Sequence, residues 1–326
     1  MLSMPVILLS NYYPKGPLEI IQSVVPKGFE LVTLETYDRE LLKEKALQTD
    51  YILASGRQRI DQEILDKAPK VKMIQRTGVG LDSLDLDYIH SINLPIYVNK
   101  GVNAISVAEH TLMLMLSTLK KLPNVHQNML AGIWNKQQQG VLNYELSGKT
   151  VGLIGMGSIG KKVAQMLKGF QVKVFYFSRT KLTNELEEEL EVNYCSLEDL
   201  IRKVDILSLH SPLNKDTHHL IDEAELKRMK PGAIIINTAR GDLINEEALI
   251  KYLSSGQIGA AGLDVFKEEP LPKTSPLLKL ENVILTPHIS GVTYDSFFDM
   301  MSSAMENIRL FEEGQYQQIE SRRLKP

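Results

Sequence analysis

The sequence KTVGLIGMGSIGKKVAQMLKGFQVKVFYFSRT, residues 149–180, predicts a strand, a tight turn, a helix and a second strand. The apolar run at 151–154 suits a short buried strand, and apolar residues recur at helical spacing from Val163 onward. Between them lies Gly155-Met156-Gly157-Ser158-Ile159-Gly160. In this pattern the first glycine permits the turn, the second lets the backbone approach a pyrophosphate, and the third lets helix pack on strand. The stretch therefore predicts dinucleotide binding, and a glycine-rich turn without a ligand is the alternative.

The end of the second strand indicates which dinucleotide is bound. NAD-binding units normally carry Asp or Glu there, which hydrogen-bonds the ribose 2′-hydroxyl. This chain has Ser178-Arg179-Thr180 instead, and a guanidinium without a neighbouring carboxylate suits a 2′-phosphate. We therefore expect NADP. NAD is the alternative if Arg179 is only a solvated surface residue.

The length and composition of the chain indicate a protein of two domains that binds a small molecule. The chain has 326 residues, enough for two domains with cores of their own. A formal net charge of −3 leaves no basic surplus for nucleic acid or an anionic membrane, so we expect a small-molecule partner. The single cysteine, Cys195, excludes an internal disulfide. Residues 1–10 lack the charged start and long apolar core of a signal peptide, and we expect a cytoplasmic protein.

Short apolar segments alternate with amphipathic helical segments through most of the chain. This alternation predicts an α/β fold with doubly wound parallel sheets covered on both faces. Residues 1–102 plus 295–326 are predicted to form one domain and residues 103–294 the dinucleotide-binding domain. Besides 151–154, strands are expected at residues 6–9, 31–34, 51–54, 71–75, 96–98, 172–177, 206–209, 233–237, 260–263 and 283–285.

Two segments are expected to serve contacts between domains or subunits. Residues 104–119 are helical in pattern and apolar on most sides, so a helix buried all round is predicted, too short and too polar for a membrane span. Residues 123–146 are predicted to be irregular and hold the only tryptophan, Trp134. That segment could reach a second subunit.

The candidate chemistry lies after the later strands, because ligands of open parallel sheets bind beyond the carboxyl ends of the strands. Arg240 could hold a carboxylate bidentately, His288 could exchange a proton with an oxygen on the reacting carbon, and Glu269 could hydrogen-bond the imidazole. Each has a plainer alternative: an ion-paired arginine, a structural histidine and a surface glutamate. The small residues of Ser55-Gly56 and 77–80 could expose backbone N–H groups to an anionic substrate, or form tight turns only.

The chain resembles the D-isomer-specific 2-hydroxyacid dehydrogenases, which include phosphoglycerate dehydrogenases and glyoxylate/hydroxypyruvate reductases. The stretches that carry the resemblance occur in family order: TGVGLDSLD, NAISVAEHTL, GLIGMGSIG, HSPLNKDTHHLI, MKPGAIIINTARGDLINEEAL, GLDVFKEEP and TPHIS. The resemblance implies two Rossmann-like domains with an interdomain active-site cleft, and a homodimer formed through the cofactor domain. It also implies that Arg240, Glu269 and His288 are the catalytic residues.

The resemblance further implies the binding contacts. Val79 and Gly80, with Ser55 and Gly56, are the predicted substrate-binding residues, and Asp264 is expected to contact the nicotinamide amide. The predicted cofactor-binding residues are Val107, Gly155, Gly157, Ser158, Ile159, Gly160, Ser178, Arg179, Thr180, His210, Pro212, Thr217, Thr238, Ala239, Asp264 and Gly291.

The expected function is NAD(P)-dependent reduction of a small 2-oxo acid of the glyoxylate/hydroxypyruvate class to the D-2-hydroxy acid. One alternative is D-3-phosphoglycerate dehydrogenase, with Arg57 and Arg59 as candidate phosphate ligands. Another is a dinucleotide-sensing, corepressor-like binding protein. No metal is expected, because there is no cysteine cluster and the adjacent His218 and His219 are predicted to point apart.

Overall fold

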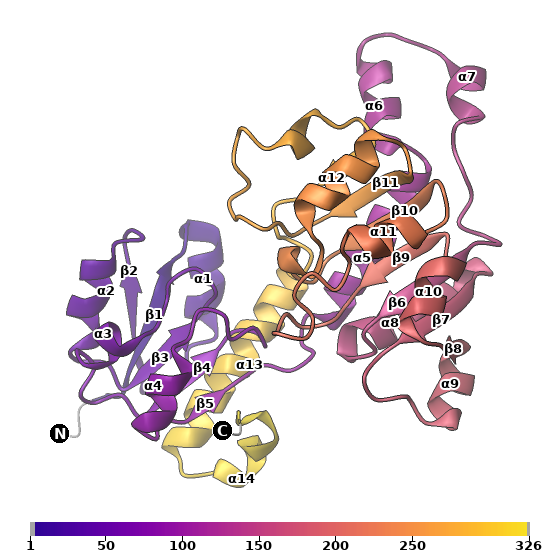
Figure 1. Ribbon diagram of the computed structural model, residues 1–326. Helices are drawn as coiled ribbons and strands as arrows, with labels where there is room; N and C mark the ends of the chain where they lie inside the picture. The colour runs from indigo at the N-terminus through magenta and orange to yellow at the C-terminus, as the bar shows by residue number, and fades with distance from the viewer. Residues whose placement is uncertain (1–3, 325–326) are drawn as a thin grey trace. The chain divides into compact units, whose positions relative to one another are not determined.

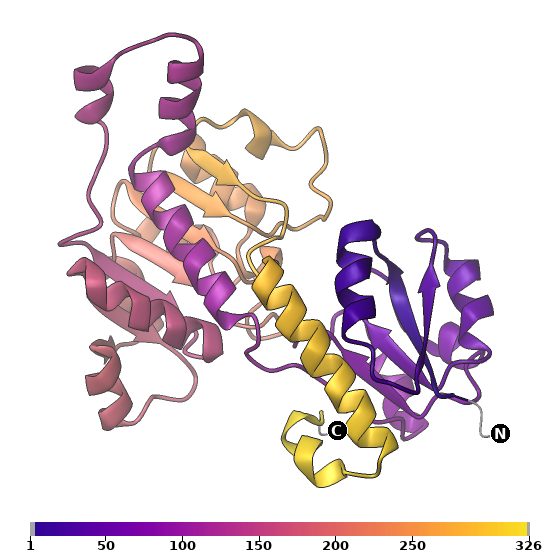
Figure 2. The ribbon, with the colours of Figure 1, turned by 180° about the vertical axis from the view of Figure 1, so that it is seen from behind.

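The computed structural model describes residues 4–324 (Figures 1 and 2). The ends of the predicted first domain, residues 1–3 and 325–326, lie outside the described residues. The chain divides into two compact units. Unit 1 contains the described residues up to Asn103 and again from Tyr294, and unit 2 is Ala104–Thr293.

Unit 1 is a five-stranded parallel sheet with helices on both faces. Its strands are β1 (Val6–Tyr12), β2 (Glu30–Leu34), β3 (Tyr51–Ala54), β4 (Met73–Arg76) and β5 (Ile96–Tyr97), in the order β2-β1-β3-β4-β5. One face is covered by α1 (Lys15–Ser23), α13 (Tyr294–Glu312) and α14 (Tyr316–Ile319), and the other by α2 (Arg39–Ala46), α3 (Gln62–Leu65) and α4 (Leu86–Ser91). Successive strand residues point to opposite faces, so Ile7 and Leu9 join one core cluster and Leu8 the other.

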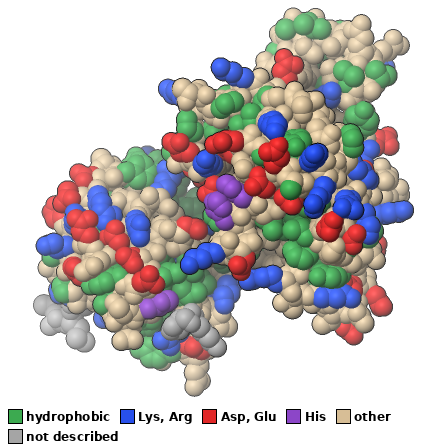
Figure 3. Space-filling view, viewed as in Figure 1, with side chains coloured by type: hydrophobic (Ala, Val, Ile, Leu, Met, Phe, Trp, Pro, Cys, Tyr) green, Lys and Arg blue, Asp and Glu red, His purple; other side chains and the backbone are tan. Residues whose placement is uncertain are grey.

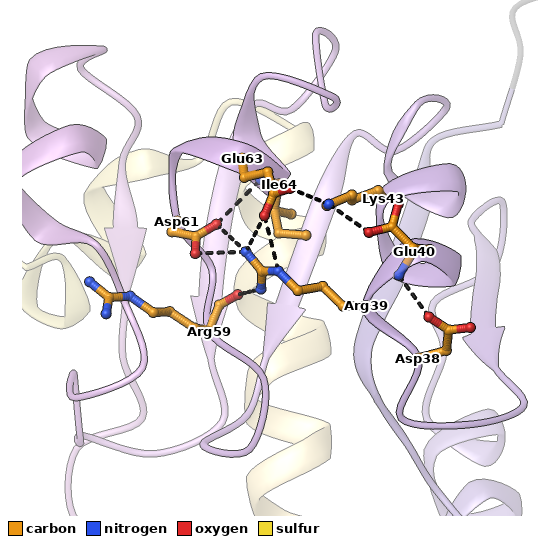
Figure 4. Close-up of polar contacts among 8 residues, drawn as sticks. All are labelled: Asp38, Arg39, Glu40, Lys43, Arg59, Asp61, Glu63 and Ile64. Carbon is orange, nitrogen blue, oxygen red and sulfur yellow. Dashed lines mark hydrogen bonds and ion pairs between the residues drawn. The ribbon is translucent and has the colours of Figure 1, made fainter.

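Charged side chains tie two helices of this unit together at the surface (Figure 4). Asp61 caps α3 and accepts from the Arg39 guanidinium at 2.6 Å. Glu63 accepts from Arg39 at 3.2 Å and also pairs with Lys43. The network links the first turns of α2 and α3 and contributes modestly, because its members are partly exposed.

Unit 2 is a seven-stranded parallel sheet, also covered on both faces. Its strands are β6 (Thr150–Ile154), β7 (Lys173–Phe177), β8 (Val192–Tyr194), β9 (Ile206–Leu209), β10 (Ala233–Asn237), β11 (Ile258–Leu263) and β12 (Val283–Leu285), in the order β12-β11-β10-β9-β6-β7-β8. One face is covered by α5 (Ala104–Leu119), α8 (Ser158–Leu167) and α9 (Asn184–Leu190), and the other by α10 (Leu197–Lys203), α11 (Glu223–Arg228) and α12 (Glu246–Ser254). Short 3₁₀ helices lie at Lys168–Phe170, Gly241–Leu243, Pro276–Lys279 and, in unit 1, Glu320–Arg322. The predicted α/β fold with parallel sheets is confirmed.

Two expectations about single elements were wrong, and one strand was not predicted. Strand β8 was not predicted, because its three residues directly follow an acidic helix and carry no periodic signal of their own. The segment predicted to be irregular contains α6 (Leu122–Leu130) and α7 (Lys136–Gly140), which stand away from the sheet of unit 2 (Figures 1 and 2). Helix α5 is not buried all round, since Ile105 and Met113 on one stripe are exposed.

The described surface carries charges of both signs. Figure 3 shows basic and acidic side chains interspersed over the face in view. Within residues 4–324 no helix combines the length and the apolar character needed to cross a membrane.

Candidate active site

The glycine-rich turn lies between β6 and α8, and each glycine has a separate physical reason. Gly155 has φ +98°, and a Cβ there would lie 2.7 Å from the carbonyl oxygen of His210. A Cβ on Gly160 would lie 2.1 Å from the carbonyl oxygen of Gly155, so the helix could not pack. A Cβ on Gly157 would meet nothing within 4 Å. The first and third glycines therefore permit the packing, and the second leaves open space where a pyrophosphate fits.

Helix α8 adds a positive electrostatic contribution to this open space. Its N-cap is Gly157, which has no side chain to cap the first backbone N–H groups. Free N–H groups and the helix dipole at this end favour an anion. The turn and helix therefore fit the phosphates of a dinucleotide.

The turn after β7 presents the residues predicted to select NADP. Ser178 Oγ donates to the carbonyl oxygen of Thr180 at 2.5 Å, which closes the turn. Arg179 at its tip is exposed and makes no hydrogen bond or ion pair with the residues that the structure describes. Its guanidinium is therefore available to a ligand.

The other predicted residues follow neighbouring strands of the same sheet. His210, Thr238 and Asp264 come directly after β9, β10 and β11, which lie side by side. Backbone hydrogen bonds keep these residues in line with the neighbouring strands. His210 N donates to Ile154 O of β6 at 2.7 Å, and Asp264 N donates to Asn237 O of β10 at 2.9 Å. The structure thus brings these residues to one edge, as expected for parallel strands.

Two of the three predicted catalytic side chains are in direct contact. His288 Nδ1 lies 2.6 Å from Glu269 Oε2, and the Phe266 amide donates to Glu269 Oε1 at 3.1 Å. Burial alone would raise the pKa of Glu269, but these two hydrogen bonds and the charges of His288 and Arg240 lower it below its usual value. A charged Glu269 accepts the proton on Nδ1, which leaves Nε2 of His288 for exchange with a ligand.

Arg240 begins the loop after Ala239, to whose carbonyl oxygen its Nη1 donates at 2.7 Å. The next residue explains how closely this loop packs on its neighbour. A Cβ on Gly241 would lie 2.0 Å from the carbonyl carbon of Phe266, so only glycine fits there. Arg240 is consequently held beside the loop that carries Glu269. The pair and the guanidinium lie on the edge that carries the glycine-rich turn, and such groups can exchange a proton and bind an anion.

Comparison with known proteins decides the class of chemistry. A model of the "D-isomer specific 2-hydroxyacid dehydrogenase, NAD binding domain" matches residues 112–290. A glyoxylate reductase of Thermococcus litoralis is 38% identical over 319 residues, 95% of each chain. A glyoxylate reductase of Aeropyrum pernix is 37% identical over 310 residues, 90% of this chain and 92% of that protein. The chain belongs to the D-isomer-specific 2-hydroxyacid dehydrogenase family.

A solved structure supports the fold and the cofactor class. The D-lactate dehydrogenase of Aquifex aeolicus, complexed with NAD and lactic acid, superposes with a TM-score of 0.87 at 30% identity and covers 98% of this chain and 99% of its own. The predicted resemblance and the two Rossmann-like domains are confirmed. The protein is an oxidoreductase that acts on the CH–OH group of 2-hydroxy acids with a nicotinamide dinucleotide. The roles of the single residues stay predictions.

Asp264 has contacts that the sequence alone did not indicate. Its side chain is fully buried, and its carboxylate accepts from Thr286 Oγ1 at 2.5 Å and from the amides of Ile289 and Ser290 at 3.0 and 2.9 Å. Both oxygens therefore hold the loop that carries His288. The backbone of His288 has φ +53°, a conformation that this loop must maintain. The structure gives Asp264 a positioning role, and a contact to the nicotinamide amide stays a prediction.

Helix α5 braces the same edge through three side chains that the sequence analysis missed. Ser106 Oγ donates to Ser290 O at 2.7 Å, and Thr111 Oγ1 lies 3.0 Å from Thr238 Oγ1. His110 Nε2 lies 3.0 Å from Thr286 Oγ1, whose only proton goes to Asp264, so His110 is the donor. Burial lowers the pKa of His110 despite the opposite effect of Asp264. The sequence did contain a signal for these contacts, because Ser106 lies one turn before His110 and Thr111, and all three are polar residues on a largely apolar helix.

The remaining predicted cofactor residues lie on the same unit. Burial lowers the pKa of His210 to about 4, so its imidazole is neutral near pH 7. Its Nε2 lies 3.0 Å from Ser208 Oγ, while Nδ1 is buried without a partner among the described residues. Thr217 Oγ1 donates to Pro212 O at 2.7 Å, which closes the loop after β9. Val107 is buried on α5, Ala239 follows Thr238, and Gly291 follows the histidine loop.

The predicted orientation of His218 and His219 was wrong. Their rings stack with centroids 3.9 Å apart at 30°, and a carboxylate oxygen of Asp242 lies within 4.8 Å of their nitrogens. The reason is a turn that the sequence pattern did not reveal, in which His219 has φ +51° and its amide donates to Asp242 O at 2.8 Å. His218, His219 and Asp242 therefore each offer one potential ligand atom within 4.8 Å of the other two.

Unit 1 holds the predicted substrate loops by a side chain that the sequence analysis did not single out. Arg76 is buried at the end of β4, and its guanidinium donates to Ser55 O at 2.6 Å and to Gly80 O at 2.8 Å. One arginine thus joins the loop of Ser55 and Gly56 to the loop of Val79 and Gly80. In contrast, Arg57 donates to Tyr37 Oη at 2.5 Å and lies over that ring.

Proposed function

We propose that this chain reduces a small 2-oxo acid of the glyoxylate/hydroxypyruvate class to the D-2-hydroxy acid, with NADPH as the preferred cofactor. The observation that carries the proposal is the 2.6 Å contact between His288 and Glu269 on the sheet edge that also bears Arg240 and the open glycine-rich turn. The relatives named glyoxylate reductase support the substrate class.

The chain's own residues divide the reaction between them. A bound nicotinamide supplies the hydride. Arg240 holds the substrate carboxylate and so fixes the position of the carbonyl carbon. His288 gives the proton on Nε2 to the carbonyl oxygen, while its Nδ1–H donates to Glu269, which fixes the orientation of the imidazole. We also propose that backbone N–H groups near Ser55, Gly56, Val79 and Gly80 contact the substrate.

A substrate panel tests the proposed reaction. We expect NADPH oxidation with glyoxylate and hydroxypyruvate, and no appreciable NAD reduction with D-3-phosphoglycerate. The stacking of Arg57 on Tyr37 argues against Arg57 as a phosphate ligand. Activity with D-3-phosphoglycerate but not with the 2-oxo acids would contradict the proposal, and inactivity with every acid would favour a binding protein.

Cofactor choice has its own test at the turn after β7. We expect Arg179→Ala to lower the ratio of kcat/KM for NADPH to that for NADH by about tenfold, because it removes a charge-assisted contact to the 2′-phosphate. Lys181→Ala is the matched control, since Lys181 already pairs with Glu187 at 3.3 Å. Wild-type preference for NADH, or equal effects of the two variants, would contradict the assignment to NADP.

We propose further that unit 2 is the dinucleotide-binding domain, unit 1 the substrate domain, and that the protein is a cytoplasmic homodimer. The matched NAD-binding model, residues 112–290, falls within unit 2. Support for the dimer comes from the arm formed by α6 and α7, which has no buried residue. Its Leu130, Trp134 and Val141 are 70%, 78% and 79% exposed, and such apolar patches mark association surfaces.

Gel filtration with light scattering tests the dimer. The wild-type chain should run at twice its monomer mass, and the double variant Leu130→Ser with Trp134→Ser should run as a monomer. Leu278→Ser is the control, because Leu278 is an exposed apolar residue of the same unit outside the arm. A monomeric wild type, or a double variant that stays dimeric, would exclude the arm as the interface.

A further inference from the structure

Unit 1 contains a cavity built from three parts of the chain that are distant in sequence. Its volume is about 320 Å³, and its walls are Asn99, Lys100, Val102, Ser303, Ser321 and Arg322. The first three follow β5, Ser303 lies on α13, and the last two belong to the 3₁₀ helix that follows α14. We refer to it as the β5/α13 cavity.

Both charged residues in these walls are cations. Lys100 Nζ donates to Ser321 O at 3.0 Å, and Arg322 Nη1 donates to Asn307 Oδ1. Among residues 4–324, neither has a carboxylate partner within 4.0 Å. Each therefore keeps N–H groups for another acceptor.

The nearby carboxylate does not neutralise them. Glu306 is bound by Arg309 on its own helix at 2.7 Å, and Arg309 also binds Glu313 at 2.6 Å. The hydrogen bond from Arg309 lowers the pKa of Glu306 against the opposing effect of burial, and the charges of Arg309 and Arg322 lower it further. The Glu306 carboxylate is thus held by Arg309, and the walls of the cavity keep the positive charges of Lys100 and Arg322.

A second cavity in the same unit shows that this charge pattern is specific. That cavity is larger, about 430 Å³, and is lined by Arg59, Asp61, Gln62, Glu63, Asp66 and Asp85. Four carboxylates and one guanidinium line it, so an anion would be repelled there. An ammonium group, a guanidinium and two hydroxyls, as in the β5/α13 cavity, are instead the donors that phosphate and carboxylate groups bind.

We propose that the β5/α13 cavity binds a small oxyanion, a phosphate or carboxylate group of a metabolite, at a site distinct from the catalytic group of unit 2. Arg322 offers its remaining guanidinium N–H groups, Lys100 a compact charge, and Ser303 and Ser321 hydroxyls. The volume exceeds that of a bare phosphate, so the ligand carries additional atoms.

The site is connected to the predicted substrate loop within unit 1. Asn99, a buried wall residue, donates from Nδ2 to Thr77 O at 3.2 Å and to Met300 O at 2.8 Å, and it accepts from Ser303 at 3.2 Å. Thr77 begins the loop that contains Val79 and Gly80. An anion that hydrogen-bonds Ser303 or shifts the backbone of Lys100 therefore changes the position of Asn99. Asn99 in turn holds the first residue of that loop through its hydrogen bond to Thr77 O. This consequence, unlike the binding itself, rests on the proposed function.

Calorimetric titration of the full chain with inorganic phosphate, and separately with malonate, at constant ionic strength tests the binding. We expect at least one of the two anions to bind, and Lys100→Gln to weaken that binding by about tenfold or more. Glutamine can still reach Ser321 O, so this variant should fold, and Arg322→Lys is a second variant that keeps the charge. Lys27→Gln, at an exposed lysine of the same unit that makes no ion pair with residues 4–324, should bind like the wild type.

The outcomes separate this site from other anion sites. No binding of either anion would overturn the proposal, as would equal binding by the wild type and Lys100→Gln, because the anion would then lie elsewhere. Binding that persists in Arg240→Ala but is lost in Lys100→Gln supports it. The titration needs no turnover, so a failed binding test and a failed activity test are distinguishable. If the connection through Asn99 is correct, the binding anion changes KM for the 2-oxo acid in the wild type and not in Lys100→Gln.

Discussion

The carboxyl edges of the two parallel sheets use polar residues in opposite ways. In unit 2 the edge presents side chains: the imidazole of His288 and the guanidinium of Arg179 are accessible, and Arg240 is partly so. In unit 1 the polar side chains at the ends of β4 and β5, which are Gln75, Arg76 and Asn99, are buried, and Arg57 after β3 is exposed. Two sheets of the same architecture therefore supply different kinds of binding group.

Buried amides show how unit 1 does this. Gln75 Nε2 donates to Arg76 O at 2.7 Å, Asn99 Nδ2 donates to Thr77 O at 3.2 Å, and Asn307 Nδ2 donates to Gln75 Oε1 at 3.0 Å. All three amides are buried. Because buried polar groups need partners, this network holds the strand end and the following loop in one conformation. We propose from this comparison that side chains carry the proton chemistry in unit 2, whereas backbone groups held by buried side chains recognise the substrate in unit 1.

The largest loss of activity is expected from substitution of the accessible side chains of unit 2, His288 and Arg240. His288→Ala should lower kcat by ~10²–10⁴-fold with a smaller change in KM, because it removes the proton donor. Arg240→Ala should impair both kcat and KM for the 2-oxo acid, because it removes the carboxylate anchor. Steady-state kinetics measure both effects. Near wild-type values for the two variants would show that the chemistry lies elsewhere.

A smaller effect is expected from the buried arginine of unit 1. Arg76→Met should raise KM for the 2-oxo acid by about 10- to 100-fold, since it releases the carbonyl groups of Ser55 and Gly80. The Kd for NADPH should stay within about twofold, because the dinucleotide turn lies in unit 2. Fluorescence titration measures that Kd, and a thermal melt identifies a variant that fails to fold. Equal losses in substrate and cofactor binding would contradict the proposal that Arg76 acts only on the substrate loops of unit 1.

Glu269→Gln should produce an intermediate effect with a pH signature. Because the pKa of Glu269 lies below its usual 4.5, the carboxylate is charged at pH 5 and above, and its support of His288 is lost only as pH falls through that lowered pKa. The variant lacks the charge at every pH. We expect kcat to fall by about tenfold and the pH profile for reduction to move to lower pH. An unchanged profile would show that Glu269 does not act on His288.

The smallest effect is expected at Val79, because its loop is proposed to contact the substrate through backbone groups and not through the side chain. The Val79 side chain is 53% exposed, so Val79→Ala should change kcat/KM by no more than about twofold. A loss as large as that of Arg76→Met would mean that the side chain, rather than the backbone, recognises the substrate.

The comparison also marks where sequence reasoning succeeded. The glycine-rich turn was predictable because each requirement is local: the turn at Gly155, the open approach at Gly157 and the helix contact at Gly160 all arise within six residues. Several strands, such as Tyr51–Ala54 and Ala233–Asn237, were placed at their observed bounds, because buried parallel strands are short apolar runs. Arg240 and His288 were singled out because each follows a predicted strand, and Glu269 because it could hydrogen-bond the imidazole.

Long-range partners were not predictable. The sequence did not indicate that the Asp264 carboxylate also holds the loop 22 to 26 residues further along the chain. The braces from α5 to Thr286 and Ser290 span 176 and 184 residues, and the Asn99–Asn307 contact spans 208.

The amino-acid sequence by itself determined the strand–helix alternation, the dinucleotide turn and the types of side chain available at the strand ends, because these depend on hydrophobic periodicity and backbone freedom over a few residues. Only the tertiary structure decided which polar groups face a ligand and which hold the backbone. That division depends on which buried donors find acceptors in distant parts of the chain, and no local pattern records such pairs.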